Sequence, residues 1–393
     1  MKTDNTVIEA WRGLAAWLVL YTHYWAFGDE ASALWRFSHT GVDLFFVISG
    51  FVFAPYWWNA QLQGPRQLAG FMVRRFFRIY PAYALALLVY VWLKSVSGAP
   101  LLYVNEHLTF FHVQSREMAF YYNAPFWSLP AEVEFYLALP VLCWLAQKIR
   151  YGFFVLCAAA ILARIFLGAQ HDWQAQDSAY IAMHHLPGLL CEFMLGALAW
   201  RAWQDWGNFG IRLNWRSPQK STDAKAAHGP TLSAIALLLA MGVGGWLALA
   251  QYFAMRADEG VRAGMLKGQM GWLAAVCFAW MVLASVLLQQ RIIQRRLLQQ
   301  RVIQRRQSRL KNIVADSLQS LALFAGKVSY GVYLLHSAML NLVQQHLGGL
   351  LSVSEAKWTA AVLTLFASVV MHELWEGPWR TLGRDISRKI QGH

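Results

Sequence analysis

The amino-acid sequence contains ten stretches of roughly 20 predominantly apolar residues, the length of helix that crosses the hydrocarbon core of a bilayer. No other feature constrains the fold as strongly. Because lipid offers the backbone no hydrogen-bonding partners, each stretch is predicted to be a helix. The sequence therefore predicts an all-α membrane protein, a single domain of residues 1–393 with about ten transmembrane helices. The predicted spans are 7–28, 41–59, 80–97, 130–147, 152–168, 182–200, 231–252, 269–289, 327–346 and 358–377.

The composition excludes several other classes of protein. Hydrophobic residues make up 57% of the chain and charged residues only 14%, whereas an average soluble protein contains roughly 25% charged residues. A water-soluble chain this apolar could not cover its surface with polar groups. This excludes a cytosolic enzyme, a disordered protein and a secreted disulfide scaffold. All four cysteines fall inside apolar stretches without metal or redox spacing, so we expect buried thiols.

The distribution of positive charge predicts the orientation of the helices. The net charge is +13, but the basic residues lie in short runs between the apolar stretches. This is typical of membrane proteins, and no nucleic-acid partner is expected. With the N-terminus inside, the cytoplasmic segments hold 24 of the 34 Lys and Arg residues and the opposite segments hold 6. The bias places both termini in the cytoplasm, together with the basic segment 290–317 and the tail 380–393.

The basic segment 290–317 contains a local repeat, in which an arginine is followed by two apolar residues and a glutamine. Its three copies begin at Arg291, Arg296 and Arg301. Five residues turn a helix through about 500°, so the apolar pairs spiral around it and form no continuous stripe. Two interpretations remain open. The segment is either a basic helix lying against anionic lipid headgroups or a solvated extension without a functional role.

Ionisable residues inside spans are the first candidates for a functional site, because they are costly in lipid and usually face a cavity or a partner. In the first span, Arg12 and His23 are eleven residues apart. On a helix this spacing puts both side chains on one face, about 16 Å apart along the axis. Arg12 then lies near the cytoplasmic end and His23 toward the outer leaflet. The alternative is an arginine that extends to the interface and a hydrogen-bonded core histidine.

Three further segments carry polar side chains to these two levels. Asp43 begins the second span at the depth of His23, where a carboxylate would orient the imidazole. Glu132 enters the fourth span at the same outer level and is a second acid–base candidate. On the cytoplasmic side, Arg75 and Arg78 present two guanidinium groups to one side of a helix, an arrangement that suits a phosphate. Ordinary cytoplasmic positive charge is the alternative for this pair.

Other histidines also fall inside spans. His336 puts a second imidazole near the middle of the ninth span. His184-His185 and His372-Glu373 are polar pairs, but neither has the spacing of a helical zinc site. The sequence therefore predicts no metal site.

Six motifs follow one another along the chain: the Arg12 and His23 pair, GVDLFFVISGF at 41–51, RRFFRIYP at 74–81, WSLPAEVEFY at 127–136, SYGVYLLH at 329–336 and Glu376-Gly-Pro378. In this order they resemble the motifs of the acyltransferase-3 family of bacterial integral-membrane acyltransferases. The resemblance runs from about residue 8 to residue 380. It implies a bacterial inner-membrane protein with an acyl-CoA donor, usually acetyl-CoA, and a hydroxyl acceptor on a cell-surface polysaccharide, lipid-linked glycan or similar glycoconjugate.

The resemblance and the predicted depths together suggest a mechanism. His23 would act as a general base on the acceptor hydroxyl, or as a transient acyl carrier, oriented by Asp43 or Glu132. The CoA nucleotide would bind to Arg75 and Arg78 at the cytoplasmic face, and its pantetheine arm would pass Arg12, so these three are the expected donor-binding residues. Further residues expected to line the site are Ser49, Trp127, Ser128, Tyr136, Ser329, Tyr333 and His336.

The sequence departs from the family in two places. Pro130 and Val133 stand where members often carry a small polar residue and a second acid, so the resemblance extends to Glu132 and not to Glu134. No hydrolase-like extracytoplasmic domain follows the last span, in contrast to fused members of the family. We therefore expect the chain either to complete the transfer itself or to pass the acyl group to a separate extracytoplasmic partner.

Two other functions are compatible with the sequence. A transporter or an envelope scaffold would line a substrate path with the same in-span His, Asp and Glu residues, but it would have no reason to bind CoA. An acyl-CoA-dependent enzyme with a small molecule or a lipid as acceptor is the second alternative. Membrane lipids are expected partners in every case.

Overall fold

The computed structural model describes residues 6–25, 36–59, 62, 64–170, 178–208, 230–255, 260–302 and 309–392, and these residues form helices and turns with no β-strand. The predicted all-α class is confirmed. The helices are α1 (Thr6–Trp25), η1 (Phe37–Thr40), α3 (Gly41–Phe53), α4 (Pro55–Trp58), α5 (Pro65–Val96), α6 (Val104–Leu108), α7 (Arg116–Phe120), η2 (Ala124–Trp127), α8 (Ser128–Lys148), α9 (Gly152–Gln170), α10 (Ser178–His184), α11 (Leu186–Asn208), α12 (Leu232–Met255), α13 (Gly260–Val302), α14 (Arg309–Leu347), α15 (Val353–Met371), η3 (His372–Glu376) and α16 (Gly377–Gln391).

Eight helical segments in the described part of the chain are long and apolar enough to cross a membrane, and they coincide with eight of the ten predicted spans. The chain is therefore a multi-pass membrane protein. The other two predicted spans, 7–28 and 327–346, fall on α1 and α14, which are helical but more polar. The eight segments are Phe37–Trp58, Pro65–Val96, Ala124–Lys148, Gly152–Gln170, Ile181–Trp206, Leu232–Met255, Gly268–Ile293 and Val353–Gln391.

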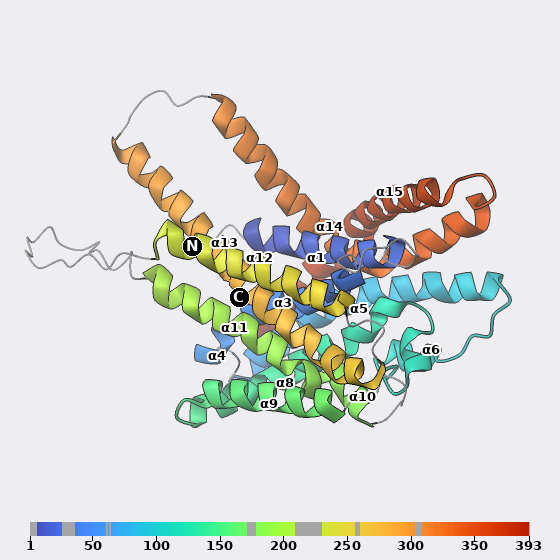
Figure 1. Ribbon diagram of the computed structural model, residues 1–393, viewed down its shortest axis with the longest axis horizontal. Helices are drawn as coiled ribbons and strands as arrows, with labels where there is room; N and C mark the ends of the chain where they lie inside the picture. Colours follow the sequence, from blue (N-terminus) through green and yellow to red (C-terminus); the bar gives the residue numbers. More distant parts are fainter. Residues whose placement is uncertain are drawn as a thin grey trace, which may run out of the picture.

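The two more polar helices, α1 and α14, pack directly against each other (Figure 1). At Gly13 the approach is so close that an added Cβ would lie 2.5 Å from the Cβ of Ala325. A buried apolar cluster that includes Leu20 and Val332 joins the two helices. Polar side chains at this contact, such as the buried His336, are thus held against protein, where ionisable groups cost less than in lipid.

Helix α3 is the most buried of the candidate spans, because 78% of its apolar window is covered by other parts of the protein. Its backbone touches that of α11 through two glycines. A Cβ added at Gly50 would lie 1.8 Å from the carbonyl oxygen of Phe193, and one added at Gly196 would lie 1.9 Å from that of Val47. Small residues at such crossings let membrane helices approach closely. By contrast, only 11% of the α12 window is buried, as expected for a helix at the periphery.

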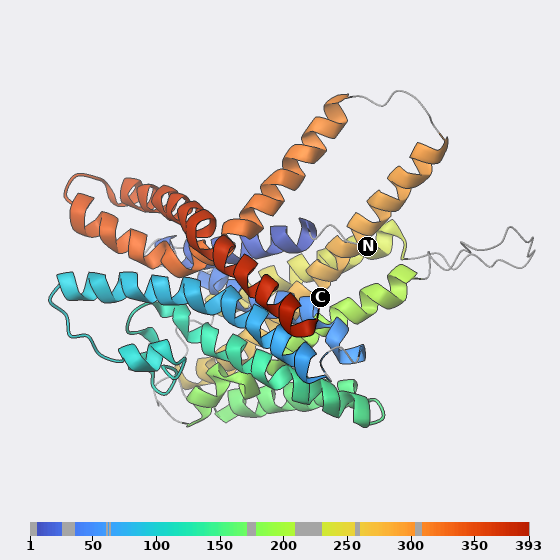
Figure 2. The same cartoon turned by 180° about the vertical axis from the view of Figure 1, so that it is seen from behind.

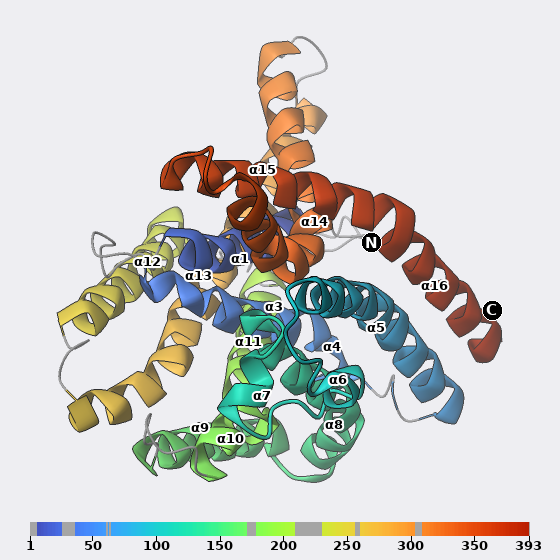
Figure 3. The ribbon, with the colours of Figure 1, turned by 90° about the vertical axis from the view of Figure 1, so that its right-hand side faces the viewer.

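Several elements lie at the ends of the helical bundle. Figure 3 looks onto the end where α6 and α7 lie. Helix α1 begins and α16 ends toward the opposite side (Figures 1 and 2). The end of α13 and the beginning of α14 project from the bundle (Figure 1). The predicted basic segment 290–317 falls on these two projections, and most of its side chains and residues 303–308 lie outside the described residues.

The C-terminal helix α16 follows α15 through the π-helical segment η3 and runs along α5 (Figure 2). A Cβ added at Gly383 of α16 would lie 2.5 Å from the Cβ of Phe77, so the two backbones are close. The rings of Phe77 and Trp379 stack with their centroids 5.7 Å apart. Arg74 donates a hydrogen bond to the hydroxyl of Ser387. Helix α16 is therefore fixed to the part of α5 that carries the predicted arginines.

Candidate active site

A pocket between α1, α3, α5, α8 and α14 is lined by nine of the thirteen predicted site residues. It contains about 750 Å³ of empty space, with open solvent at its mouth included. The nine residues are Arg12, Ser49, Arg75, Arg78, Ser128, Glu132, Tyr136, Ser329 and Tyr333. The other four, His23, Asp43, Trp127 and His336, are not part of this lining.

Arg75 is surrounded by aromatic rings at one side of the pocket. Its guanidinium carbon lies 4.9 Å from the ring centroid of Phe53, 5.7 Å from that of Phe71 and 5.8 Å from that of Tyr136. Rings at these distances attract a cation. The Nε atom of Arg75 is buried and has no hydrogen-bond partner among the described residues. The rings fix the position of the guanidinium group while leaving its Nε–H for an anion.

Arg78 lies one turn further along α5, among acidic groups. The groups that favour its charge most strongly are Glu376, Tyr136, Glu132 and Glu9. These groups come from η3, α8 and α1, so Arg78, on α5, occupies a point where α1, α5, α8 and the end of α15 meet. A charge in this apolar bundle requires such compensation.

Glu132 lines the same pocket as Arg12, Arg75 and Arg78, which we call the arginine pocket. This placement differs from the prediction that put Glu132 beside His23. The hydroxyl of Tyr136 donates a hydrogen bond to the Glu132 carboxylate one helical turn away. Glu132 also acts on the charge of Arg78. Depth along the membrane normal was the only basis for pairing Glu132 with His23, and depth does not fix which helices are neighbours.

His23 and His336 form an imidazole pair between α1 and α14. Their ring centroids are 4.9 Å apart. The Nδ1 atom of His23 lies 2.8 Å from the carbonyl oxygen of Val19, and that of His336 lies 3.0 Å from that of Val332. A carbonyl oxygen only accepts, so Nδ1 carries the proton in each ring and Nε2 has the lone pair when the ring is neutral. The Nε2 atom of His336 is buried without a partner among the described residues.

Asp43 lies in a separate buried cluster with Arg164 and Glu192, and the structure does not place it against His23. A Cβ added at Gly271 would lie 2.5 Å from Oδ1 of Asp43, 3.0 Å from Nη2 of Arg164 and 3.3 Å from Oε1 of Glu192. Arg164 and Glu192 form an ion pair of 3.9 Å. The cluster joins α3, α9, α11 and α13. Its residues are far apart in the sequence, which is why a pairing argument restricted to the family motifs missed it.

The cluster still has an indirect connection to His23. Two residues before Asp43, Gly41 packs against α1, where an added Cβ would lie 2.7 Å from the carbonyl oxygen of Ala15 and 3.1 Å from Cγ2 of Val19. Val19 supplies the carbonyl that fixes the ring of His23. Asp43 is therefore placed to position the start of α3, and through it α1, instead of touching the imidazole.

Ser128 and Tyr333 connect the start of α8 to α14 at the pocket wall. The Tyr333 hydroxyl donates to the carbonyl oxygen of Pro125 at 2.6 Å, and the Ser128 hydroxyl lies 2.5 Å from the Tyr333 oxygen. Ser329 donates to the carbonyl oxygen of Gly326 at 2.7 Å. These hydroxyls shape the wall, because their protons are used within the protein. Trp127, next to this wall, has its ring 5.0 Å from that of His184.

Glu134, the second acid of its motif, has a structural role. Its carboxylate accepts a hydrogen bond from the backbone N–H of Leu186 at 2.8 Å, at the start of α11. The same carboxylate contacts Nδ1 of His185, whose Nε2 lies 2.9 Å from the carbonyl oxygen of Val113. Glu134 thus caps one helix from another, as acidic groups do at helix N-termini.

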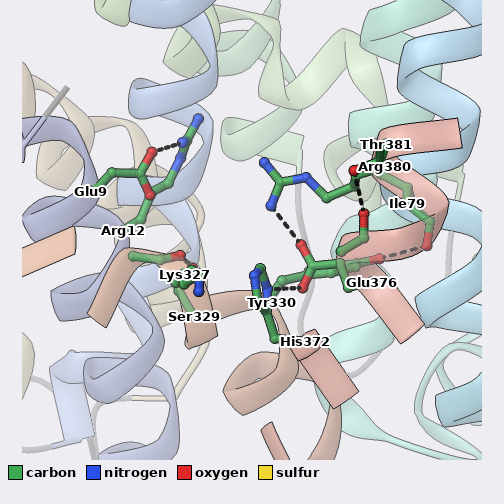
Figure 4. A network of polar contacts seen from close by, with 12 residues as sticks. Glu9, Arg12, Ile79, Lys327, Ser329, Tyr330, His372, Glu376, Arg380 and Thr381 are labelled. Carbon is green, nitrogen blue, oxygen red and sulfur yellow. Dashed lines mark hydrogen bonds and ion pairs between the residues drawn. The ribbon is translucent and has the colours of Figure 1, made fainter. Parts of the chain in front are cut away.

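Two site residues, Glu376 and Arg380, received no role from the sequence. The structure places them beside the arginine pocket, with Arg380 on the side opposite Arg12 (Figure 4). Arg380 donates to Oε1 of Glu376 at 3.0 Å, and Nδ1 of His372 lies 3.2 Å from Oε2. The i, i+4 spacing of Glu376 and Arg380 is the sequence signal that could have found the pair. Within the described residues, no cluster of three or more His, Cys, Asp or Glu residues could hold a metal ion.

Comparison with known proteins identifies the family. The profile described as an acyltransferase domain of the Acyl_transf_3 type matches residues 5–371. The chain is 29% identical over 218 residues to a protein of Komagataeibacter xylinus provisionally named the membrane-bound transacylase BcsY, which covers 51% of this chain and 52% of that protein. It is 31% identical over 190 residues to Nodulation protein 10 of Rhizobium leguminosarum bv. viciae, which covers 41% of this chain and 50% of that protein.

These relatives define how far the similarity reaches. The chain spans about half the length of the curated relatives it matches. No solved structure matches it significantly. The family profile, however, covers nearly the whole chain, from before α1 to the end of α15. The chain therefore belongs to the acyltransferase-3 family.

Proposed function

We propose that the chain is a membrane acyltransferase of the bacterial cytoplasmic membrane. It would move an acyl group, most simply acetyl, from cytoplasmic acyl-CoA to a hydroxyl of a cell-surface polysaccharide, lipid-linked glycan or similar glycoconjugate. The observation that carries the proposal is the pocket in which Arg12, Arg75 and Arg78 converge inside an apolar helical bundle. Membership of the family and the transacylase name of one relative support acyl transfer.

The arginine pocket suits a donor that carries phosphate groups. Guanidinium groups bind phosphate oxygens through pairs of parallel hydrogen bonds. Arg75 keeps an unpartnered Nε–H, and its position is fixed by three rings. A transporter for a neutral glycan would not need such a group. Acyl-CoA has phosphates at its nucleotide end and a thioester at the end of a long, flexible arm, which fits a charged pocket and a candidate reactive group that lies further along the same helix, α1.

The reactive group in this proposal is His23. It lies eleven residues along α1 from Arg12, about 16 Å in a helix, a distance that the pantetheine arm of CoA could span. The Val19 carbonyl fixes its Nδ1–H, so Nε2 is the basic nitrogen of the neutral ring. A carbonyl thus fixes the tautomer, a role that the sequence argument assigned to a carboxylate.

The transfer step then follows without a net change in protons. The acceptor oxygen attacks the thioester carbon while Nε2 of His23 takes the hydroxyl proton. The new C–O bond forms, the C–S bond breaks, and the thiolate takes the proton from the imidazolium to give CoA thiol. His336 places a second Nε2 lone pair close to the first ring, and it is the alternative base.

The test compares surface glycans of cells that carry wild-type protein, no protein or the His23→Ala variant, by mass spectrometry. Of these three, only cells with the wild type should show an acyl-mass increment on a glycan. His346→Ala, at an exposed position of α14, is a matched control that should keep the increment. Removal of a positioned base costs ~10²–10⁴-fold in rate. If His23→Ala modifies the glycan at the wild-type level, His23 is not the base. If all glycans are unchanged by the protein, the glycan acceptor is refuted.

A further inference from the structure

Arg380 extends the arginine pocket on the side opposite Arg12 (Figure 4). Its side chain reaches from α16 toward Arg12 (Figure 4), and the positive charges that act on it are those of Arg78 and Arg12. We propose that Arg380 is a fourth donor-binding arginine. With Arg78 and Arg12 it forms a subsite for a phosphate group of acyl-CoA, and Glu376 holds it in position. This inference rests on the proposed function.

The first argument is the fixed position of the Arg380 guanidinium group. One of its nitrogens, Nη1, donates to Oε1 of Glu376 at 3.0 Å. The Glu376 side chain is only 2% exposed, and its other oxygen contacts Nδ1 of His372. Both oxygens of the carboxylate are therefore occupied, so it holds Arg380 at a defined place. The π-helical turn η3 that carries His372 and Glu376 is a form of helix often found at functional sites.

The second argument is the balance of charge. Four arginines meet here with three glutamates, so the described groups leave an excess of one positive charge. Like charges repel strongly in a medium of low dielectric constant, and such a convergence is stabilised by an anion bound between them. A phosphate is suited to this role, because guanidinium forks match its oxygens. The groups are Arg12, Arg75, Arg78, Arg380, Glu9, Glu132 and Glu376.

The third argument separates Arg380 from the other basic residues of α16. The Arg388 side chain is 70% exposed, whereas that of Arg380 is 36% exposed. Arg384 is exposed and donates to the hydroxyl of Thr381. Helix α16 is fixed to α5 through Gly383 and Phe77, so Arg380 keeps its place relative to Arg78. The exposure of Arg384 and Arg388 is typical of basic residues near a membrane surface, whereas Arg380 is half-buried and held by Glu376.

The experiment measures donor binding to the purified full chain in detergent by isothermal calorimetry. CoA and 3′-dephospho-CoA are the probes, and the proteins are the wild type, Arg380→Ala, Arg380→Lys and the matched control Arg384→Ala. Loss of charge-assisted hydrogen bonds predicts CoA binding weaker by about 10–100-fold for Arg380→Ala. Arg380→Lys should lose part of this, because it keeps the stem and the charge but not the fork. Arg384→Ala should bind within about twofold of the wild type.

The two probes identify the phosphate. If Arg380→Ala weakens CoA but not dephospho-CoA, the subsite holds the 3′-phosphate. Equal losses for both probes assign it to the diphosphate. Wild-type CoA affinity in both Arg380 variants would overturn the inference while leaving the proposed function intact. Absence of CoA binding by the wild type would instead refute the donor in the proposed function. Folding of each variant is checked by size-exclusion profile, and Arg380→Lys decides if Arg380→Ala does not fold.

Discussion

A stacked histidine pair predicts that one end of the bundle is sensitive to acid. His107 and His112 are completely buried, with ring centroids 4.1 Å apart and planes 9° apart. They lie outside the candidate spans, in the connection between α5 and α8. Burial lowers the pKa of His107 to about 4. Burial, with the charge of His107, lowers the pKa of His112 to about 3. Nε2 of His107 and Nδ1 of His112 have no partner among the described residues.

The sign and the size of the effect follow from these values. When the connection between α5 and α8 unfolds locally, both imidazoles regain the ordinary histidine pKa and bind protons below it. In the folded connection their pKa values are lower, so they stay neutral down to about pH 4. The folded connection therefore loses stability as pH falls from 7 to 5. From pH 7 to pH 5 each ring costs about 1.8 kcal/mol and the pair about 4 kcal/mol at most. The other titratable groups near the pair are Glu106, His185, Tyr83 and Tyr122.

The assay is hydrogen exchange of peptides from residues 103–127 at pH 7 and pH 5, corrected for intrinsic exchange rates. A loss of about 4 kcal/mol corresponds to an opening equilibrium larger by about 10²–10³-fold. The His107→Phe variant keeps an aromatic ring and removes one titrating group, so its acid sensitivity should fall to about half. The pair anchors η2, because His112 contacts the carbonyl oxygen of Phe126 just before Ser128. Equal protection of these peptides at both pH values would refute the reasoning.

Three further predictions concern packing, the buried charge cluster and topology. Gly50→Ala should lower the thermal unfolding temperature in detergent markedly, because its Cβ would lie 1.8 Å from the Phe193 carbonyl, whereas Gly244→Ala, with open space around it, should not. Arg164→Ala removes the cation of the buried cluster, which pairs with Glu192 at 3.9 Å, and should cost about 3–5 kcal/mol in unfolding free energy. Arg201→Ala, whose side chain is 42% exposed, should cost less than about 1 kcal/mol; equal effects would contradict the cluster. Reporter fusions should place segments 60–79, 201–230 and 290–317 in the cytoplasm, and an extracytoplasmic 290–317 would contradict the ten-span topology.

The sequence predicted the helices well because apolar length is a local property. Eight of the ten predicted spans meet the length and apolarity of a membrane helix within the described residues. The other two, on α1 and α14, carry Arg12, His23 and His336 and are less apolar for that reason. The nine predicted residues that share one pocket were found because helical spacing and family motifs both select side chains that face the same interior.

The partners of the buried acids could not be predicted, because depth in the membrane does not determine which helices are adjacent. Asp43 was one of two alternative partners for His23, chosen by its depth, yet it lies with Arg164 and Glu192 from α9 and α11. Glu132 was likewise assigned to His23 and lies in the arginine pocket. These pairings depend on long-range packing such as the α3–α11 crossing, which leaves no local signal in the sequence.

Arg380 was missed for a different reason. It falls beyond the predicted end of the tenth span and was counted as cytoplasmic charge. The structure continues the helix through η3 into α16, which returns along α5 and brings Arg380 back to the pocket. A π-helical turn changes the helical register, so simple periodicity cannot locate residues that follow it.

Binding of acetyl-CoA to the purified protein is the measurement that tests the central claim most directly, because it needs no knowledge of the acceptor. Calorimetry should show saturable binding by the wild type, weaker by at least about tenfold for Arg78→Ala, since a charge-assisted hydrogen bond is lost. His23→Ala should bind within about threefold of the wild type, because its role lies in the chemical step. No binding by the wild type, or equal binding by Arg78→Ala, would contradict an arginine pocket that holds the acyl-CoA donor.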